Sequence, residues 1–113
     1  MYHRFDEQKY PSTNIQMSVF KEQIELLEKL NFNFLNPNNF KKNYTKANNK
    51  KTVLITIDDG FQSFYENAWP YLKDKKIPFL LFISTEAVGK NGYMNWNQII
   101  EIEKSGLGII GNH

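Results

Sequence analysis

Two adjacent carboxylates followed by a glycine, Asp58, Asp59 and Gly60, are the residues of this sequence most able to do chemistry. Two close carboxylates repel each other when both are ionised, so such a pair needs a cation or a shared proton. One carboxylate can bind a divalent metal while its neighbour accepts a proton from water. A solvated Asp-Asp-Gly turn without chemistry is also compatible with these residues. The three residues alone leave both interpretations open.

A strand is expected to deliver these carboxylates to the edge of a sheet. The residues from Val53 to Ile57 are branched or apolar except Thr56, which is typical of a parallel strand covered on both faces. Such strands present functional side chains at their C-terminal ends. In a regular strand Asp58 and Asp59 would point to opposite faces, but Gly60 lets the backbone turn so that both can face one crevice.

Upstream of this strand, the pattern predicts a strand, a helix and a brief second strand. Residues 1–5 read as a short aromatic strand, followed by a polar loop over residues 6–14. Ser18 is expected to cap a helix whose apolar residues recur every three or four positions. These residues are Phe20, Ile24, Leu27 and Leu30. Residues 32–35 are expected to form a brief strand, and the Asn- and Lys-rich residues 36–51 a surface connection without an assigned function.

Downstream, helices and strands continue to alternate. An irregular aromatic segment is expected after Gly60, and Pro70 is expected in the first turn of a short helix that ends near residue 75. Residues 77–84 read as a second strand that is apolar on both faces. Asn95 and Gln98 have the spacing of a capping box, and the helix that they begin should end at Gly106. A last strand follows, and the alternation predicts parallel pairing, so that strand ends share one edge.

The order of these segments resembles the polysaccharide deacetylase family, the NodB-homology domain of carbohydrate esterases. The segments that carry the resemblance are TIDDG, IPFLLFIST, MNWNQIIEIEKSG and IIGNH. In that family the first motif reads TFDDG and the second H-[ST]-x-x-H, with a Pro at the start of the strand and a Trp at the start of the helix between them. Here Ile57 stands in place of the usual Phe. Residues 2–15 also resemble the opening of a branch that acts on N-acetylglucosamine polymers.

The resemblance implies metal-dependent removal of acetyl groups from a carbohydrate polymer. It implies Asp58 as the general base, Asp59 as a metal ligand and His113 as the first metal-binding histidine of the second motif. Zinc fits His and carboxylate ligands, and cobalt or another divalent ion is an alternative. The second metal histidine, the oxyanion contact and the general acid are then expected beyond residue 113.

The same resemblance implies a distorted (β/α) barrel. A complete barrel needs roughly 200 residues or more, so the 113 residues are expected to form the N-terminal portion of one catalytic domain, with about half of its strands. The first residues are expected to form a strand, and they show neither the pattern expected of a signal peptide nor, like the rest of the 113 residues, an apolar run long enough to span a membrane. The resemblance implies that the parent protein is exported.

Composition and motifs argue against several other functions and leave one alternative open. A net charge of +2 gives no basis for nucleic-acid binding, and the absence of cysteine excludes disulfides and thiol catalysis. A phosphoacceptor receiver domain would need a further aspartate at a later strand end, whereas Asp74 lies at a predicted helix end. A non-catalytic or vestigial carbohydrate-binding fragment remains an alternative. His3 could line the pocket beside the metal, but we favour a packing role because it has no partner at ligand spacing.

Overall fold

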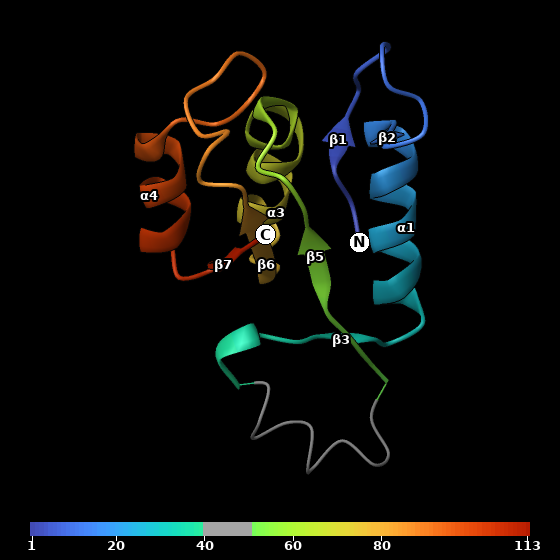
Figure 1. The fold of residues 1–113 in the computed structure, drawn as a ribbon. Coiled ribbons are helices and arrows are strands. Elements are labelled where there is room, and N and C mark those ends of the chain that lie inside the picture. Colours follow the sequence, from blue (N-terminus) through green and yellow to red (C-terminus); the bar gives the residue numbers. More distant parts are fainter. Residues whose placement is uncertain (40–50) are drawn as a thin grey trace.

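The structure, a computed structural model, describes residues 1–39 and 51–113 and is a mixture of helices and strands. Most of the predicted connection 36–51 lies outside the described residues. In chain order the elements are β1 (Arg4–Phe5), β2 (Asn14–Ile15), α1 (Met17–Lys29), β3 (Asn33–Phe34), η1 (Pro37–Asn39), β4 (Thr52–Val53), β5 (Ile55–Ile57), η2 (Phe64–Ala68), α3 (Trp69–Asp74), β6 (Phe79–Ile83), α4 (Trp96–Lys104) and β7 (Gly108–Asn112). Figure 1 shows β5 between α1 on one side and α4 on the other.

A parallel sheet in the order β5, β6, β7 forms the centre of the molecule, as the alternation of elements predicts. The first strand extends this sheet on the other side of β5. There the Tyr2 N–H donates to the Thr56 carbonyl at 2.9 Å, and the Asp58 N–H donates to the Tyr2 carbonyl at 2.8 Å. Further parallel pairs join β1 to β2 and β3 to β4. The C-terminal ends of β1, β5, β6 and β7 therefore lie at one edge.

The two faces of the sheet are buried to different extents, although the apolar pattern of the strands is typical of cover on both faces. On one face the side chains of β5 and β6 are almost inaccessible, among them Ile57, Phe79 and Leu81 at 0% exposure. Leu80 and Ile109 are register partners on the opposite face and are only half-buried. Because α3 and α4 supply the buried residues Trp69, Leu72, Ile99 and Ile102, the helices account for the covered face.

The helix α1 begins one residue before the predicted cap at Ser18. Its N-cap is Gln16, which makes no capping bond of its own, and the Met17 N–H instead donates to Asp6 Oδ1 at 2.8 Å. A carboxylate from the loop after β1 thus replaces the local cap, and its charge suits the helix N-terminus. The predicted apolar stripe is buried at Phe20 and Ile24, but Leu30 is 44% exposed because the helix ends before it.

The segment after the Asp-Asp-Gly turn is helical rather than irregular. A π-helical turn, η2, runs directly into α3, and Pro70 lies in the first turn of α3 as predicted. Proline has no N–H to donate, so it is tolerated at the start of a helix. The side chains of Ser63 and Asn67 on this segment bond to the backbone N–H and carbonyl of Phe5 at 3.2 and 2.9 Å. The segment therefore fixes β1 beside the sheet.

The last helix agrees closely with its prediction. Asn95 Oδ1 accepts the Gln98 N–H at 3.0 Å, while Gln98 Oε1 accepts the Asn95 N–H at 2.8 Å, which completes the capping box. Gly106 ends the helix with a φ of +74°. A Cβ at Gly108 would overlap the Ile102 side chain, so this glycine allows α4 to pack closely on β7. No helix within the described ranges is both long and apolar enough to cross a membrane.

Candidate functional site

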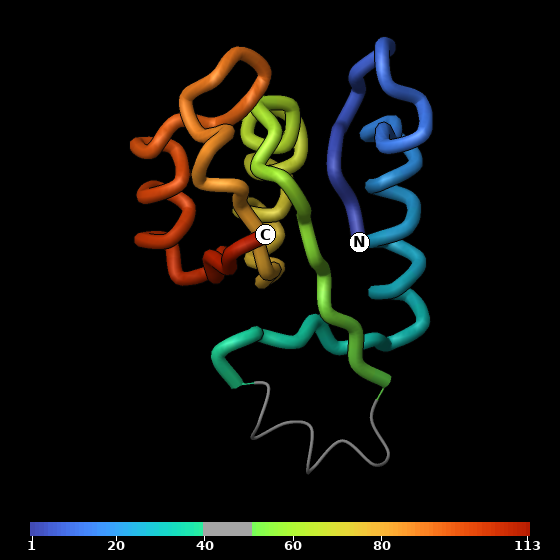
Figure 2. The backbone as a smooth tube through the Cα atoms, in the orientation of Figure 1, coloured from blue at the N-terminus to red at the C-terminus, as the bar shows by residue number. Residues whose placement is uncertain are grey.

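The structure brings the two aspartates and His113 together at the C-terminal edge of the sheet. Asp58 and Asp59 follow β5, and His113 follows β7. The backbone N–H of His113 donates to the carbonyl of Ile83, the last residue of β6, at 2.9 Å and so fixes the end of β7. Figure 2 shows both chain ends near the middle of the molecule. The aspartates and His113 come together because β5 and β7 belong to one parallel sheet, and only parallel strands carry their C-terminal ends to the same edge.

Asp58 is the most enclosed member of this group, at 8% exposure. Its Oδ2 lies 3.9 Å from His3 Nε2 and 3.7 Å from His113 Nε2, which is ion-pair distance but too long for hydrogen bonds. Its Oδ1 is buried and has no hydrogen-bond partner among the described residues. A buried carboxylate oxygen without a donor costs free energy unless a proton, a cation or a ligand reaches it. The Oδ1 atom of Asp58 is therefore free to accept a proton or a hydrogen bond from a ligand.

The turn after Asp58 uses two left-handed residues, where the sequence pointed only to Gly60. Asp59 has a φ of +70° and Gly60 a φ of +72°. This conformation is uncommon for residues other than glycine, although aspartate tolerates it better than most. Backbone strain of this kind concentrates at functional sites. It turns the Asp59 carboxylate toward His113, with 3.6 Å between Asp59 Oδ1 and His113 Nδ1.

A carboxylate oxygen and an imidazole nitrogen are ligands that a zinc-like cation accepts. Two atoms that each bind such an ion at about 2 Å lie roughly 3 to 4 Å apart, and the 3.6 Å between Asp59 and His113 falls within that range. In residues 1–39 and 51–113 no cluster of three or more His, Cys, Asp or Glu side chains could hold a metal ion. The donor atoms of Asp59 and His113 are chemically compatible with a divalent cation, and this pair would supply two ligands.

His3 reaches the same site, although the sequence favoured a packing role for it. Its side chain is 24% exposed, and its Nε2 faces Asp58 Oδ2. The chain changes its hydrogen-bonding partner at this residue, since Tyr2 pairs with β5 while the Arg4 N–H donates to the Thr13 carbonyl at 3.1 Å. Placing residues 1–5 beside β5 in a parallel sheet would have revealed this position. The sequence alone does not place His3 there, because the inference also needs the order of the strands in the sheet.

The aromatic residues after the turn belong mainly to the core. Phe61 is 5% exposed and Phe64 is fully buried, so neither ring presents a face to a sugar. The ring of Phe61 packs 3.5 Å from the Arg4 guanidinium carbon and 4.9 Å from the ring of Tyr93. Sequence reasoning missed this contact, because it joins three segments that are distant along the chain.

The chain is similar to known proteins of one family. A family model described as polysaccharide deacetylase matches residues 45–113. The chain is 35% identical over 107 residues to a poly-beta-1,6-N-acetyl-D-glucosamine N-deacetylase of Staphylococcus aureus, a match that covers 88% of this chain and 37% of the relative. A protein of the same name from Staphylococcus epidermidis is 34% identical over 100 residues, covering 83% and 35%. The chain therefore spans little more than a third of these relatives.

Solved structures show the same fold. The structure of IcaB from Ammonifex degensii superposes with a TM-score of 0.87 at 34% identity, covering 99% of this chain and 50% of that one. A de-N-acetylase from Aggregatibacter actinomycetemcomitans gives a TM-score of 0.87 at 20% identity, covering 99% and 52%. At that lower identity the likeness concerns the fold alone.

Proposed function

The chain belongs to the polysaccharide deacetylase family, and from this membership we propose that it forms the catalytic edge of an enzyme that hydrolyses N-acetyl groups on an N-acetylglucosamine polymer. The observation that carries the proposal is the meeting of Asp58, Asp59 and His113 at one edge of a parallel sheet. Because the chain covers 37% of its Staphylococcus aureus relative, we propose this activity for a protein of the relative's length. The relatives' names support an amide of a β-linked glucosamine polymer as the substrate.

In this proposal Asp58 is the general base. Its enclosed Oδ1 has no donor in the described part of the chain and can accept the proton of the attacking water. The water oxygen then bonds to the acetyl carbon, the carbon–nitrogen bond breaks, and the products are acetate and the free amine. His3 and His113 flank Oδ2 of the same carboxylate and would orient it. The acid that protonates the departing nitrogen is assigned to none of the described residues.

The proposed cofactor is a divalent cation held by Asp59 and His113, with zinc as the first candidate and cobalt as an alternative. Such an ion would polarise the acetyl carbonyl and activate the water. A catalytic zinc site normally has three protein ligands. In this proposal the third ligand is a residue outside these 113. Residues outside them also form the strands that would close the sheet into a distorted (β/α) barrel.

Acetate release from N-acetylglucosamine oligomers, measured with a chain of the relatives' length, tests this function. Release should stop after chelation and return when zinc or cobalt is added. Replacing Asp58 by Asn keeps the shape of the side chain but removes the base, so turnover should fall by about 100-fold or more. Metal content measured on the same variant should stay unchanged.

Asp74→Asn is the matched control, because it makes the same chemical change at an exposed residue at the end of α3. It should leave acetate release unchanged. Full turnover by Asp58→Asn would remove Asp58 as the base, and release that is indifferent to chelation would overturn the metal-dependent mechanism.

A further inference from the structure

A stack of four planar groups borders the candidate site. The Arg4 guanidinium carbon lies 4.1 Å from the centre of the Tyr10 ring and 3.5 Å from that of Phe61, so the guanidinium contacts both rings. Phe61 in turn contacts Tyr93. Arg4 directly follows His3 of the site, and Phe61 comes directly after the Asp-Asp-Gly turn. The stack therefore extends from the catalytic edge toward the loop after β1.

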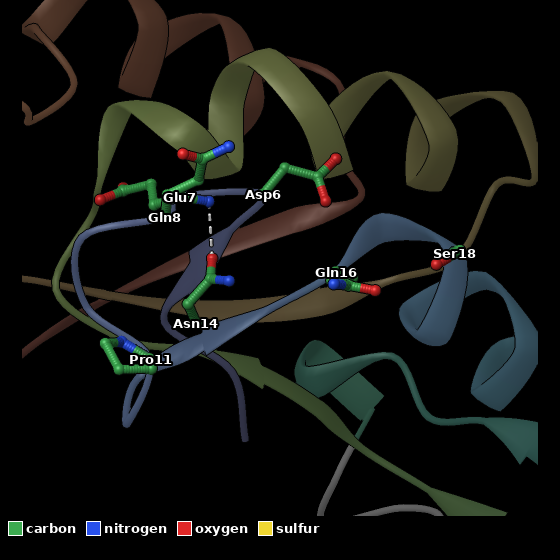
Figure 3. Close-up of a pocket in the computed structure, with 7 residues that line it drawn as sticks. All are labelled: Asp6, Glu7, Gln8, Pro11, Asn14, Gln16 and Ser18. Carbon is green, nitrogen blue, oxygen red and sulfur yellow. Dashed lines mark hydrogen bonds between the residues drawn. The ribbon is translucent and has the colours of Figure 1, made fainter.

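Hydrogen bonds hold this stack in place. Glu7 Oε2 accepts a bond from Arg4 Nη1 at 2.8 Å, and Glu7 Oε1 accepts one from the Ser63 hydroxyl at 2.6 Å. The backbone N–H of Glu7 donates to Asn14 Oδ1 at 2.8 Å, the bond drawn in Figure 3. The charge of Arg4 is thus compensated, and its guanidinium plane is fixed before any ligand arrives. The loop is also closed by the Thr13 N–H, which donates to the Tyr10 carbonyl at 3.2 Å.

Tyr10 is the solvent-facing end of the stack. It is 41% exposed, whereas Phe61 is 5% exposed. The Lys9 ammonium approaches the Tyr10 ring only to 5.4 Å. Tyrosine has few rotatable bonds, and packing against a fixed guanidinium restricts them further, so binding to its ring costs little conformational entropy. An exposed aromatic surface held in one orientation is suited to contact the flat apolar face of a ligand.

A depression of about 650 Å³ lies at the same end of β1, beside the chain segment that carries Tyr10. Figure 3 shows Asp6, Glu7 and Gln8 on one side of it and Pro11, Asn14, Gln16 and Ser18 on the other. Gln8 and Pro11, on either side of Tyr10 in the sequence, both line it, together with Asn14 and Gln16. Carboxamides supply both hydrogen-bond donors and acceptors, as a ligand rich in hydroxyl groups requires. An exposed aromatic ring and carboxamides on the same loop and the neighbouring strand suit the apolar C–H face and the hydroxyl groups of a pyranose.

We propose that Tyr10 and this depression bind a sugar unit of the polymer at a distance from the acetyl group being hydrolysed. The inference rests on the proposed function for its substrate class, but it assigns a separate contact that the chemistry at Asp58 does not need. Tyr10 then selects for polymer length, because only an oligomer long enough to reach from the catalytic edge to the loop after β1 touches it.

Binding of N-acetylglucosamine oligomers to a chain of the relatives' length tests this directly. Affinity is measured by NMR titration with a short and a long oligomer, in an Asp58→Asn background that prevents turnover. Tyr10→Ala should weaken the long oligomer about five- to tenfold and leave the short one unchanged. Tyr10→Phe keeps the ring and should bind like the parent chain. Leu26→Ala, which truncates another exposed apolar side chain on α1, should have no effect on either oligomer.

The outcomes separate the two proposals. Equal affinity of Tyr10→Ala and the parent chain for the long oligomer would overturn the role of Tyr10 and leave the deacetylase proposal standing. A parent chain that binds neither oligomer would remove the substrate class, and the sugar site with it. If Tyr10→Ala lost affinity equally for the short and the long oligomer, that would also count against the proposal, because it would place Tyr10 at the sugar unit that reacts.

Discussion

At the scale of single residues, two neighbouring aspartates differ because their surroundings differ. Asp58 is enclosed between His3 and His113, while Asp59 is more exposed and has a left-handed backbone. In a regular strand the two side chains would point to opposite faces, and the turn instead directs both to one edge. One carboxylate is then suited to accept a proton and the other to bind a cation. The proposed division of roles would then follow from conformation, since the two side chains are chemically identical.

A first prediction concerns metal binding by the 113-residue chain. Asp59 and His113 offer two ligands where a catalytic zinc site has three, so calorimetric titration should detect only weak binding, with little heat at micromolar zinc. Asp59→Ala should remove what binding there is, and Asp74→Ala should not. Tight stoichiometric binding that survives Asp59→Ala would mean that other residues hold the ion.

At the scale of elements, Glu101 connects α4 to the helical segment after the turn. Its Oε2 accepts the Tyr65 hydroxyl at 2.6 Å, and its Oε1 faces Trp69 Nε1 at 3.4 Å and Lys73 Nζ at 3.5 Å. The hydrogen bond from Tyr65 is the main reason why the pKa of Glu101 lies below its ordinary value. The same bond, with Tyr65 as the donor, raises the pKa of the tyrosine. These contacts hold α4 against the covered face of the sheet.

A second prediction follows from the sign of these shifts. A carboxyl whose pKa is lower in the folded chain stabilises it above the unfolded pKa, near 4.5 for Glu101, and this contribution disappears as the pH falls through the folded pKa. Tyr65→Phe should therefore lower the thermal midpoint slightly at neutral pH, because the contact is solvent-exposed. The difference from the parent chain should shrink in acid. Tyr93→Phe is the matched control, since its hydroxyl has no hydrogen bond within the described residues. A Tyr65→Phe difference that is constant across this pH range would contradict the role of Glu101.

At the scale of the whole molecule, helices cover one face of the sheet, whereas the apolar side chains on the other face are only half-buried. We call this second face the half-open face. Leu80 and its register partner Ile109 lie on the half-open face, and Phe82 on the same face packs over the backbone of Gly111. Within the described residues β7 pairs only with β6, so its other side presents unpaired N–H and carbonyl groups. Open edges next to apolar surface favour pairing between chains.

The third prediction is that the 113-residue chain self-associates in solution. Size-exclusion chromatography with light scattering should show a mass above 13.4 kDa that rises with concentration, and amide exchange should be fastest in β7. Ile109→Lys places a charge on the half-open face and should shift the population toward monomer. Ile100→Lys, on the exposed side of α4, is the control and should not. A sharp monomer with cooperative thermal unfolding would show that the chain is self-sufficient.

Local sequence determined the elements and the edge at which the site lies. The capping box of Asn95 and Gln98, the helix start at Pro70 and the strand β6 are each specified by neighbouring residues. The predicted strand 53–57 is divided in the structure, where β4 pairs with β3 and only β5 joins the central sheet. Parallel pairing follows from the alternation of helices and strands, and it brings Asp58, Asp59 and His113 to one edge. These features could be predicted because each depends on contacts within a few positions or on a rule that holds for all such sheets.

Only the tertiary structure decided which distant side chains meet. The carboxylate of Asp6 caps α1 in place of Ser18, His3 joins the site, and Tyr10 rests on Arg4. It also decided that one face of the sheet stays half-open, although the strands are apolar on both. None of these contacts has a characteristic spacing, because each depends on where two separate segments are placed by the packing of the rest. Sequence periodicity reports the neighbours along one element, whereas the partners across elements are selected by the fold as a whole.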